Sequence, residues 1–261
     1  MARARSLTDA LPLRRAFSVP KGGHALHENE DAAAGPSEQD GVLRAAVADG
    51  ATEGVFSGVW ARALAEAALH DPDPARAVAA ARAAFEAAVA PRRAALPWYA
   101  AAQAEAGANA AVIAIELKLP TGGGAWRAWA VGDACLLHLR AEEGGRLRLA
   151  TAWPLDDPAA FGARPRLVRS AGPLPAPEHA AGTWQPGDAF VLATDALAAH
   201  LLATDVAAAL RPDSPDAFDR FVADARAGGL RNDDATLLVL APTPALAPTP
   251  ALAPPPAPHA A

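Results

Sequence analysis

Strand-like and helix-like segments fall into partly separate blocks along this chain of 261 residues. Short apolar runs predict strands at 42–47, 108–119, 125–140, 189–193 and 236–240. Apolar residues at helical spacing predict helices at 57–70, 75–90, 97–106 and 215–227. This partial segregation favours α+β layers over a strictly alternating doubly wound sheet. The expected fold class is therefore α+β.

We expect one folded domain over residues 13–241. The composition, with 52% hydrophobic and 20% charged residues, allows a substantial core. Residues 1–12 are expected to form a flexible N-terminus. Residues 242–261 are rich in Ala and Pro, and the sequence APTPAL occurs at 241–246 and again at 247–252. Because proline at this density favours an extended backbone, we expect this segment to be a disordered tail.

Charge and composition disfavour several classes of function. The formal charge of −6 provides no positive field that would attract nucleic acid or anionic lipid. No stretch reaches the roughly 18 apolar residues that a membrane span needs, and the N-terminus lacks the apolar core of a secretory signal. The single cysteine, Cys135, lies in an apolar run and excludes a disulfide framework. We expect a cytoplasmic monomer that binds neither nucleic acid nor a membrane.

Acidic residues recur where apolar runs begin or end, in the segments NED at 29–31, VADG at 47–50, ATD at 193–195 and NDD at 232–234. Aspartate at a strand end is a common turn former, so each position alone is a weak indication of a ligand. Carboxylates held together at the edge of a rigid sheet would suit hard divalent cations, which prefer oxygen ligands. Since the segments are far apart in sequence, tertiary structure would have to assemble such a site.

These segments resemble, in family order, five motifs of the protein phosphatase 2C (PPM-type) family. The resemblance covers Glu28 to Leu240. The matching residues are Asn29-Glu30-Asp31-Ala32, Val47-Ala48-Asp49-Gly50, Val131-Gly132-Asp133, Gly187-Asp188 with the strand that ends in Thr194-Asp195, and Asp233-Asp234-Ala235-Thr236. Five motifs in order make a joint indication that no single position makes.

The resemblance implies a four-layer αββα sandwich, in which helices flank two antiparallel sheets, and a centre of two Mn²⁺ or Mg²⁺ ions at one sheet edge. It implies that Asp49 bridges the two ions and that Asp49 and Asp31 are catalytic. Glu30 and Asp31 would act mainly through coordinated water, and Asp133 matches the site of a third, weaker ion in some members. The implied metal-binding set is Glu30, Asp31, Asp49, Gly50, Asp133, Asp195 and Asp233.

The sequence departs from the family pattern in phosphate handling. Many members have an arginine three residues before the Asn-Glu-Asp, where it binds the substrate phosphate, but here that residue is Leu26. A leucine makes no bidentate phosphate contact, so other groups, for example Lys21, His24 or His27, would have to supply it. The loop 51–54 reads Ala-Thr-Glu-Gly, which places Glu53 near the expected cleft, and the usual glycine after Asp195 is alanine.

Two classes of function follow from this resemblance. The first is a metal-dependent phosphatase that hydrolyses phosphoserine or phosphothreonine of a protein substrate and opposes a Ser/Thr kinase in bacterial signalling. The second is a phosphatase-fold module that binds a phosphoprotein or a kinase without turnover, which the loss of arginine at Leu26 favours. We favour the enzyme, because a protein that has lost catalysis need not keep Asp49, Asp195 and Asp233 together.

Overall fold

The computed structural model describes residues 13–51, 54–93, 96, 104–119, 123–162 and 165–241. Several expectations lie outside these described residues. They are the flexible segment 1–12, the tail 242–261, the loop residue Glu53 and positions 97–103 of an expected helix. The three residues 104–106 of that helix are helical.

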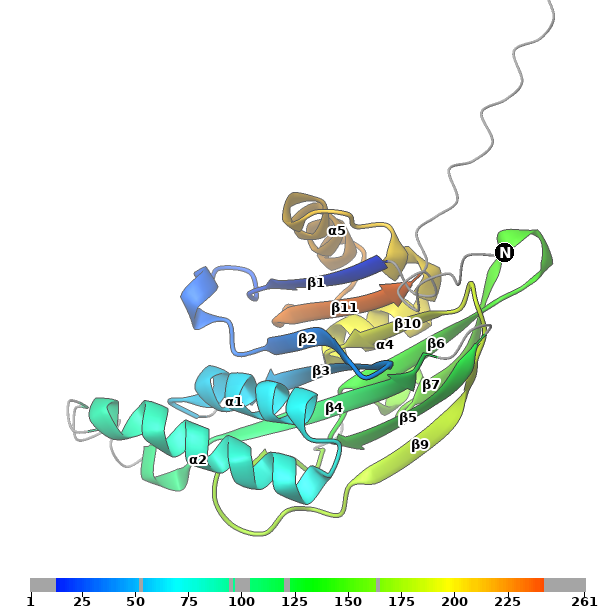
Figure 1. Ribbon diagram of the computed structural model, residues 1–261. Coiled ribbons are helices and arrows are strands. Elements are labelled where there is room, and N and C mark those ends of the chain that lie inside the picture. Colours follow the sequence, from blue (N-terminus) through cyan, green and yellow to red (C-terminus); the bar gives the residue numbers. More distant parts are fainter. Residues whose placement is uncertain are drawn as a thin grey trace, which may run out of the picture.

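The first sheet has five antiparallel strands in the order β1-β11-β10-β6-β7 (Figure 1). Its members are β1 (Leu13–Val19), β6 (Cys135–Ala141), β7 (Leu147–Trp153), β10 (Ala189–Ala193) and β11 (Ala235–Ala241). The central strand β10 is buried along its whole length, as its continuous apolar sequence predicts. The first and last strands of the described chain are neighbours, and Leu13 is paired with Ala241.

The second sheet is also antiparallel, with strand order β2-β3-β4-β5-β9 and the short strand β8 paired with β4. Its members are β2 (Ala32–Gln39), β3 (Val42–Gly50), β4 (Asn109–Lys118), β5 (Gly124–Val131), β8 (Val168–Arg169) and β9 (Glu178–Trp184). Strands β3 and β4 at its centre are nearly continuous apolar runs because both faces of the sheet are covered there.

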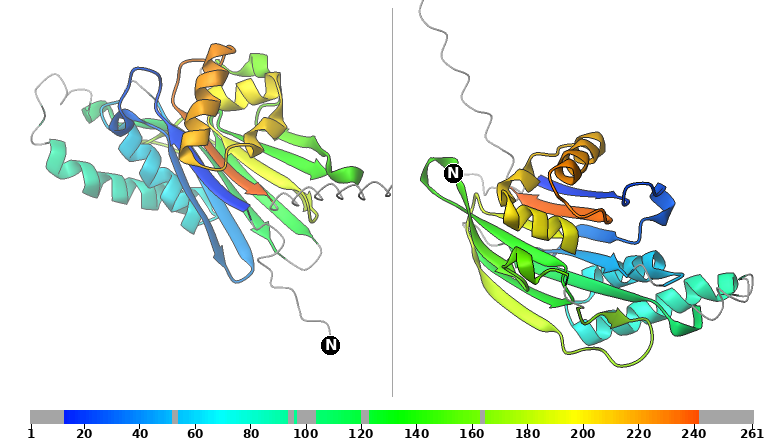
Figure 2. Two further views of the ribbon diagram at one scale, coloured as in Figure 1. Left: turned by 90° about the horizontal axis from the view of Figure 1, so that it is seen from above. Right: turned by 180° about the vertical axis from the view of Figure 1, so that it is seen from behind.

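Helices cover the outer faces of both sheets. The second sheet packs against α1 (Ser57–His70) and α2 (Pro74–Arg93), whose buried residues include Trp60 and Phe85. The first sheet packs against α4 (Asp195–Ala203), the 3₁₀ helix η5 (Val206–Leu210) and α5 (Pro215–Ala227), with Leu197 and Phe218 buried. Figure 2 shows these helix layers on opposite sides of the two sheets.

A third apolar layer lies between the two sheets. It contains Leu43 and Ile113 of the second sheet and Leu136 and Leu192 of the first, all of them fully buried. The order of layers is therefore helix, sheet, sheet, helix. The expected αββα arrangement of two antiparallel sheets flanked by helices is confirmed.

One expected strand is wrong. The apolar run 125–140 forms two strands, β5 and β6, which belong to different sheets. The strand is interrupted at Gly132, which has φ +103°. A Cβ at this position would lie 2.5 Å from the Cβ of Ala111. Only glycine combines this left-handed backbone with so close an approach. The break leaves Asp133 in the turn between the two sheets.

No helix in the ranges that the structure describes is long and apolar enough to cross a membrane.

Candidate metal centre

Acidic residues from four different segments meet in one pocket of about 290 Å³. Asp49 comes from the end of β3, Asp133 from the turn after β5, Asp195 from the first turn of α4, and Asp233 from the loop before β11. Gly50 lines the same pocket. The structure thus brings together five of the seven residues in the expected metal-binding set.

Burial and neighbouring negative charges raise the pKa values of two of these carboxylates, Asp49 and Asp133. The pKa of Asp49 is well above its usual value, first because of burial and then because of the negative charges of Asp31, Asp195 and Asp133. Burial, together with the charge of Asp195, raises the pKa of Asp133 to about 6. Such crowding of like charges is unfavourable unless a cation offsets it.

The other two expected ligands, Glu30 and Asp31, lie just before β2 and do not line this pocket. Asp31 is buried, and its Oδ2 accepts a hydrogen bond of 3.0 Å from Thr194 Oγ1. Burial and the charge of Asp234 hold the pKa of Asp31 well above its usual value. Glu30 is half-buried, and its carboxylate lies 3.9 Å from Lys21 Nζ.

Gly50 allows the end of β3 to approach its neighbours closely. A Cβ at this position would lie 2.6 Å from the carbonyl oxygen of Glu30 and 2.9 Å from that of Ser57. Any larger residue would therefore separate β3 from the segment before β2 and from the start of α1. Close packing alone therefore explains why a glycine is required at position 50, whether or not its carbonyl oxygen binds a metal ion.

Asp234 is a supporting residue to which the sequence assigned no role. Its Oδ1 accepts a hydrogen bond of 2.7 Å from the backbone nitrogen of Lys21, and its Oδ2 accepts one of 2.8 Å from that of Glu30. The buried carboxylate of Asp234 thereby holds the loop after β1 against the start of β11. The acidic doublet Asp233-Asp234 was the available indication, but sequence alone does not tell which member faces the pocket.

A polar network behind the pocket joins the first sheet to the segment before β2. The hydroxyl of Thr194 accepts a hydrogen bond from the backbone nitrogen of Thr236 at 3.0 Å while it donates to Asp31. The hydroxyls of Ser18 and Thr236 lie 2.6 Å apart, and Asn29 Nδ2 donates to Ser18 Oγ at 2.8 Å. Strands β1 and β11, together with Thr194 directly after β10, therefore fix the position of Asn29 and Asp31.

Arg231 was not predicted from the sequence and is the cation in this pocket. Its Nη2 forms an ion pair with Asp195 and lies 3.3 Å from Asp233 Oδ2. As arranged, no three His, Cys, Asp or Glu side chains among the described residues are positioned to hold a metal ion. The oxygen donors of the pocket fit Mn²⁺ or Mg²⁺ in kind. An ion at Asp195 and Asp233 would have to replace the guanidinium.

The residues considered for phosphate binding lie elsewhere. Leu26 is on a 3₁₀ helix (Leu26–Glu28) and its surface is 73% exposed. Neither Leu26 nor Lys21, His24 or His27 lines the acidic pocket. Cys135 is buried at the start of β6, and burial raises the pKa of its thiol to about 12, as expected of a core residue.

The fold is shared with solved phosphatase structures. No family model and no curated protein sequence matches this chain. The serine/threonine phosphatase PstP/Ppp of Mycobacterium tuberculosis is 19% identical, with 88% of this chain and 99% of that chain covered and a TM-score of 0.57. The PPM Ser-Thr phosphatase MsPP of Mycobacterium smegmatis, in complex with cacodylate, is 20% identical, with coverages of 89% and 99% and a TM-score of 0.53. The PstP catalytic domain with two manganese ions is 21% identical, with coverages of 87% and 97% and a TM-score of 0.52.

Proposed function

We propose, from the premise that this chain has the fold of the PPM-type Ser/Thr phosphatases, that it is a metal-dependent phosphatase acting on phosphoserine or phosphothreonine of protein substrates. The observation that carries the proposal is the meeting of Asp49, Asp133, Asp195 and Asp233 in one pocket. Their mutual charge repulsion favours a bound cation, and their all-oxygen chemistry suits Mn²⁺ or Mg²⁺. The manganese ions of the PstP catalytic domain support the same choice of metal.

In this proposal the chain holds two ions, and a third weaker one at Asp133. Asp49, Asp195 and Asp233 would hold the pair through their carboxylates and Gly50 through its carbonyl oxygen, while Glu30 and Asp31 would act mainly through coordinated water. When bound, such ions supply Lewis acidity and a water of lowered pKa. The hydrogen bond from Thr194 orients the Asp31 carboxylate, and Asp234 fixes the backbone at Glu30.

Arg231 has a place in both states of this site. Without a metal ion, its guanidinium balances the charges of Asp195 and Asp233. If these carboxylates held ions, the Arg231 guanidinium would be free beside the pocket, where its planar N–H donors would suit a phosphate group. We assign Arg231 the phosphate contact that Leu26 does not make.

The runner-up function is a module that binds a phosphoprotein or a kinase without hydrolysis. The observation that favours it is the ion pair of Arg231 with Asp195, because Asp195 is an expected metal ligand. A cation built into the chain would neutralise part of the site permanently if no metal ion displaced it. A bacterial, cytoplasmic signalling role opposite a Ser/Thr kinase is part of the proposal in either case.

Hydrolysis of p-nitrophenyl phosphate and of a phosphothreonine peptide, each with and without Mn²⁺, separates the two functions. The enzyme releases nitrophenol and phosphate only when the metal is present. A chain that binds the phosphopeptide but releases no phosphate at any Mn²⁺ concentration is the binding module.

Millimolar Mn²⁺ is expected to raise the melting temperature, and to raise it more at pH 7.5 than at pH 5. The pKa of Asp133 is raised to about 6, so this carboxyl is largely protonated at pH 5 and charged at pH 7.5. A raised carboxyl pKa means that stability from this group is lost as the pH rises through 6, and a bound cation restores it. Differential scanning fluorimetry at both pH values measures the shift, and an equal or absent shift contradicts the expectation.

Arg231→Gln is expected to increase Mn²⁺ affinity by up to about fivefold, because the cation that competes for Asp195 and Asp233 is removed and a half-exposed ion pair is worth up to about 1 kcal/mol. Calorimetric titration with Mn²⁺ measures this change in affinity. The KM for the phosphopeptide is expected to rise in the same variant, because the proposed phosphate contact is lost. Arg211→Gln is the matched control. Arg211 Nη2 lies 2.8 Å from Asp205 Oδ2, and neither residue lines the acidic pocket. Equal affinities in both variants would show that Arg231 does not compete with the metal.

A further inference from the structure

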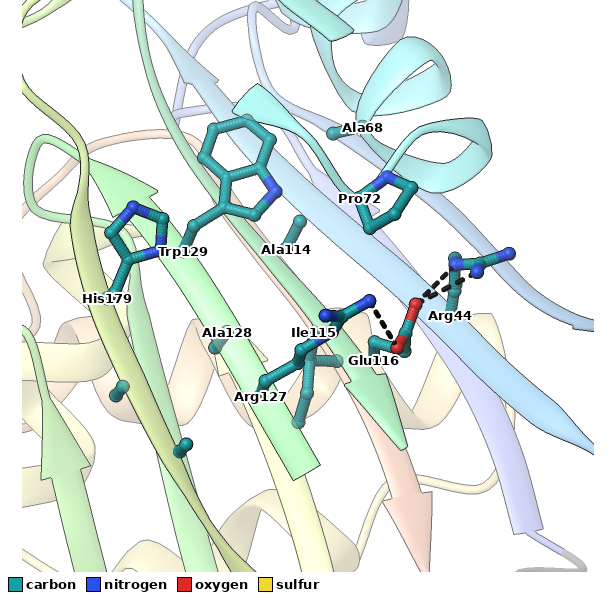
Figure 3. Close-up of a pocket in the computed structure, with 12 residues that line it drawn as sticks. Arg44, Ala68, Pro72, Ala114, Ile115, Glu116, Arg127, Ala128, Trp129 and His179 are labelled. Atoms are coloured by element: carbon teal, nitrogen blue, oxygen red, sulfur yellow. Dashed lines mark hydrogen bonds and ion pairs between the residues drawn. The ribbon is translucent and has the colours of Figure 1, made fainter. Parts of the chain in front are cut away.

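A second pocket, of about 350 Å³, lies on the outer face of the second sheet and shares no residue with the acidic pocket. In Figure 1, α1 and α2 lie over one side of this sheet, while β5 and β9 extend beyond them. The pocket opens where the helical cover stops, with Ala68 of α1 and the following Pro72 forming one wall. Figure 3 shows the strands of the sheet as its floor.

Two rows of paired residues across four strands form this floor. One row is Arg44, Glu116, Arg127 and Ala181, and the next is Ala46, Ala114, Trp129 and His179. All of these residues except Ala46 line the pocket. Residues two apart on a strand share a face, so both rows point outward. The small side chains Ala114 and Ala181 leave the space that the larger neighbours surround.

The first row carries a fixed excess of positive charge. The Glu116 carboxylate is only 7% exposed and lies 2.9 Å from Arg44 Nη2 and 2.8 Å from Arg127 Nη2. Two guanidinium groups and one carboxylate leave one net positive charge among these three residues. Each guanidinium has five N–H donors, and Figure 3 shows both converging on the single carboxylate at the edge of the hollow.

The second row offers a flat apolar surface with one polar atom. Trp129 is 4% exposed, and its Nε1 has no hydrogen-bond partner among the described residues. A buried N–H donor without a partner costs about 1 to 3 kcal/mol. In Figure 3 the pyrrole edge of the Trp129 ring is turned toward the side of Pro72, and the exposed His179 lies beside the ring.

We propose that this pocket binds a small organic monocarboxylate with a flat apolar body. The single excess positive charge matches a monoanion, whereas a phosphate monoester carries about −1.5 to −2 at neutral pH. The planar carboxylate pairs with the guanidinium of Arg127, as such groups do bidentately. The apolar body lies against Trp129 and Pro72, in a volume typical of small-molecule sites, which are about 300 to 1,000 Å³.

Calorimetric titration with 2-naphthoate and with its neutral isostere 2-naphthamide tests this proposal. The carboxylate is expected to bind at least about tenfold more tightly than the amide. In an NMR titration, the indole N–H signal of Trp129, assigned with Trp129→Phe, is expected to move. Equal affinities, no binding of either compound, or movement of other tryptophan signals alone would overturn the proposal.

Arg127→Gln is expected to weaken 2-naphthoate binding about tenfold and to leave 2-naphthamide binding unchanged. Arg148→Gln is the matched control, because the two arginine side chains are 60% and 61% exposed and each pairs with one glutamate at 2.8 Å. Both variants are expected to fold, since both side chains are largely exposed. If both variants bind 2-naphthoate as the unaltered chain does, Arg127 is not the anion contact and the proposal is wrong.

Discussion

Asp49→Asn is expected to abolish metal-dependent phosphate release, with a loss greater than about 100-fold. Even residues that only orient metal ligands change activity or metal affinity about 10- to 100-fold when they are altered, and Asp49 is the proposed bridging ligand itself. An amide in its place has no negative charge and offers one oxygen instead of two. Turnover of p-nitrophenyl phosphate and of the phosphothreonine peptide at saturating Mn²⁺ measures the loss.

The stability of the same variant separates a lost metal site from a lost fold. Burial and four neighbouring carboxylates raise the pKa of Asp49, so its charge opposes folding of the metal-free chain. Asp49→Asn is therefore expected to keep or raise the melting temperature without metal and to remove most of the increase that Mn²⁺ causes. Asp219→Asn makes the same change on the exposed face of α5 and should alter neither. A variant that retains full Mn²⁺-dependent turnover would rule out Asp49 as a ligand.

Asp188→Ala is expected to lower the free energy of unfolding by about 3 to 5 kcal/mol, the range for removing one partner from a buried ionic network. Asp188 has no exposed surface, and its Oδ2 lies 2.9 Å from His138 Nε2. Its Oδ1 accepts a hydrogen bond of 2.9 Å from the backbone nitrogen of Ala141, and Oδ2 accepts one of 3.1 Å from that of Gln185. Alanine would leave these donors buried without an acceptor.

Urea denaturation of Asp188→Ala, Asp188→Asn and Asp219→Ala measures this effect. The asparagine variant keeps one acceptor oxygen, so its loss is expected to be about 1 to 3 kcal/mol, and Asp219→Ala should change little because that side chain is exposed. Mn²⁺ affinity of the folded Asp188 variants is expected to be unaltered, since Asp188 does not line the acidic pocket. A midpoint for Asp188→Ala equal to that of Asp219→Ala would contradict the structural role.

The sequence predicted the central elements better than the peripheral ones. Burial leaves a clear pattern of apolar residues in the central elements, and this pattern predicted strands β3, β4, β10 and β11 and helices α1 and α2. The outer strands β1, β2, β7 and β9 were not predicted, since their residues alternate less clearly. In addition, β1 and β9 pair with strands that are distant in sequence, β11 and β5. The break at Gly132 was hidden because the run is apolar on both sides of it.

The acidic pocket shows a similar division. Strand-end motifs indicated its carboxylates, but an isolated arginine in a loop has no periodicity, so Arg231 could not be found in advance. The Gly187-Asp188 pair stands before a strand, which by itself indicates only a turn. The contacts of Asp188 with His138 and Ala141 depend on pairing of β10 with β6, about fifty positions away in the chain, which no local pattern records.

The pairing of β1 with β11 also determines how the domain would respond to tension. The two strands are antiparallel from Leu13 opposite Ala241 to Val19 opposite Ala235. Residues 13 and 241 therefore lie at the same end of the ladder of hydrogen bonds. Pulling them apart would load the hydrogen bonds one pair at a time, as in a zipper, instead of shearing all of them together. The ladder would open from residues 13 and 241 toward Ser18 and Thr236, whose hydroxyls belong to the network that fixes Asn29 and Asp31. A pulling force on the chain would thus first separate Arg15 and Phe17 from Pro212 and Phe218 of the helical layer, and would then loosen the support of the acidic pocket at Ser18.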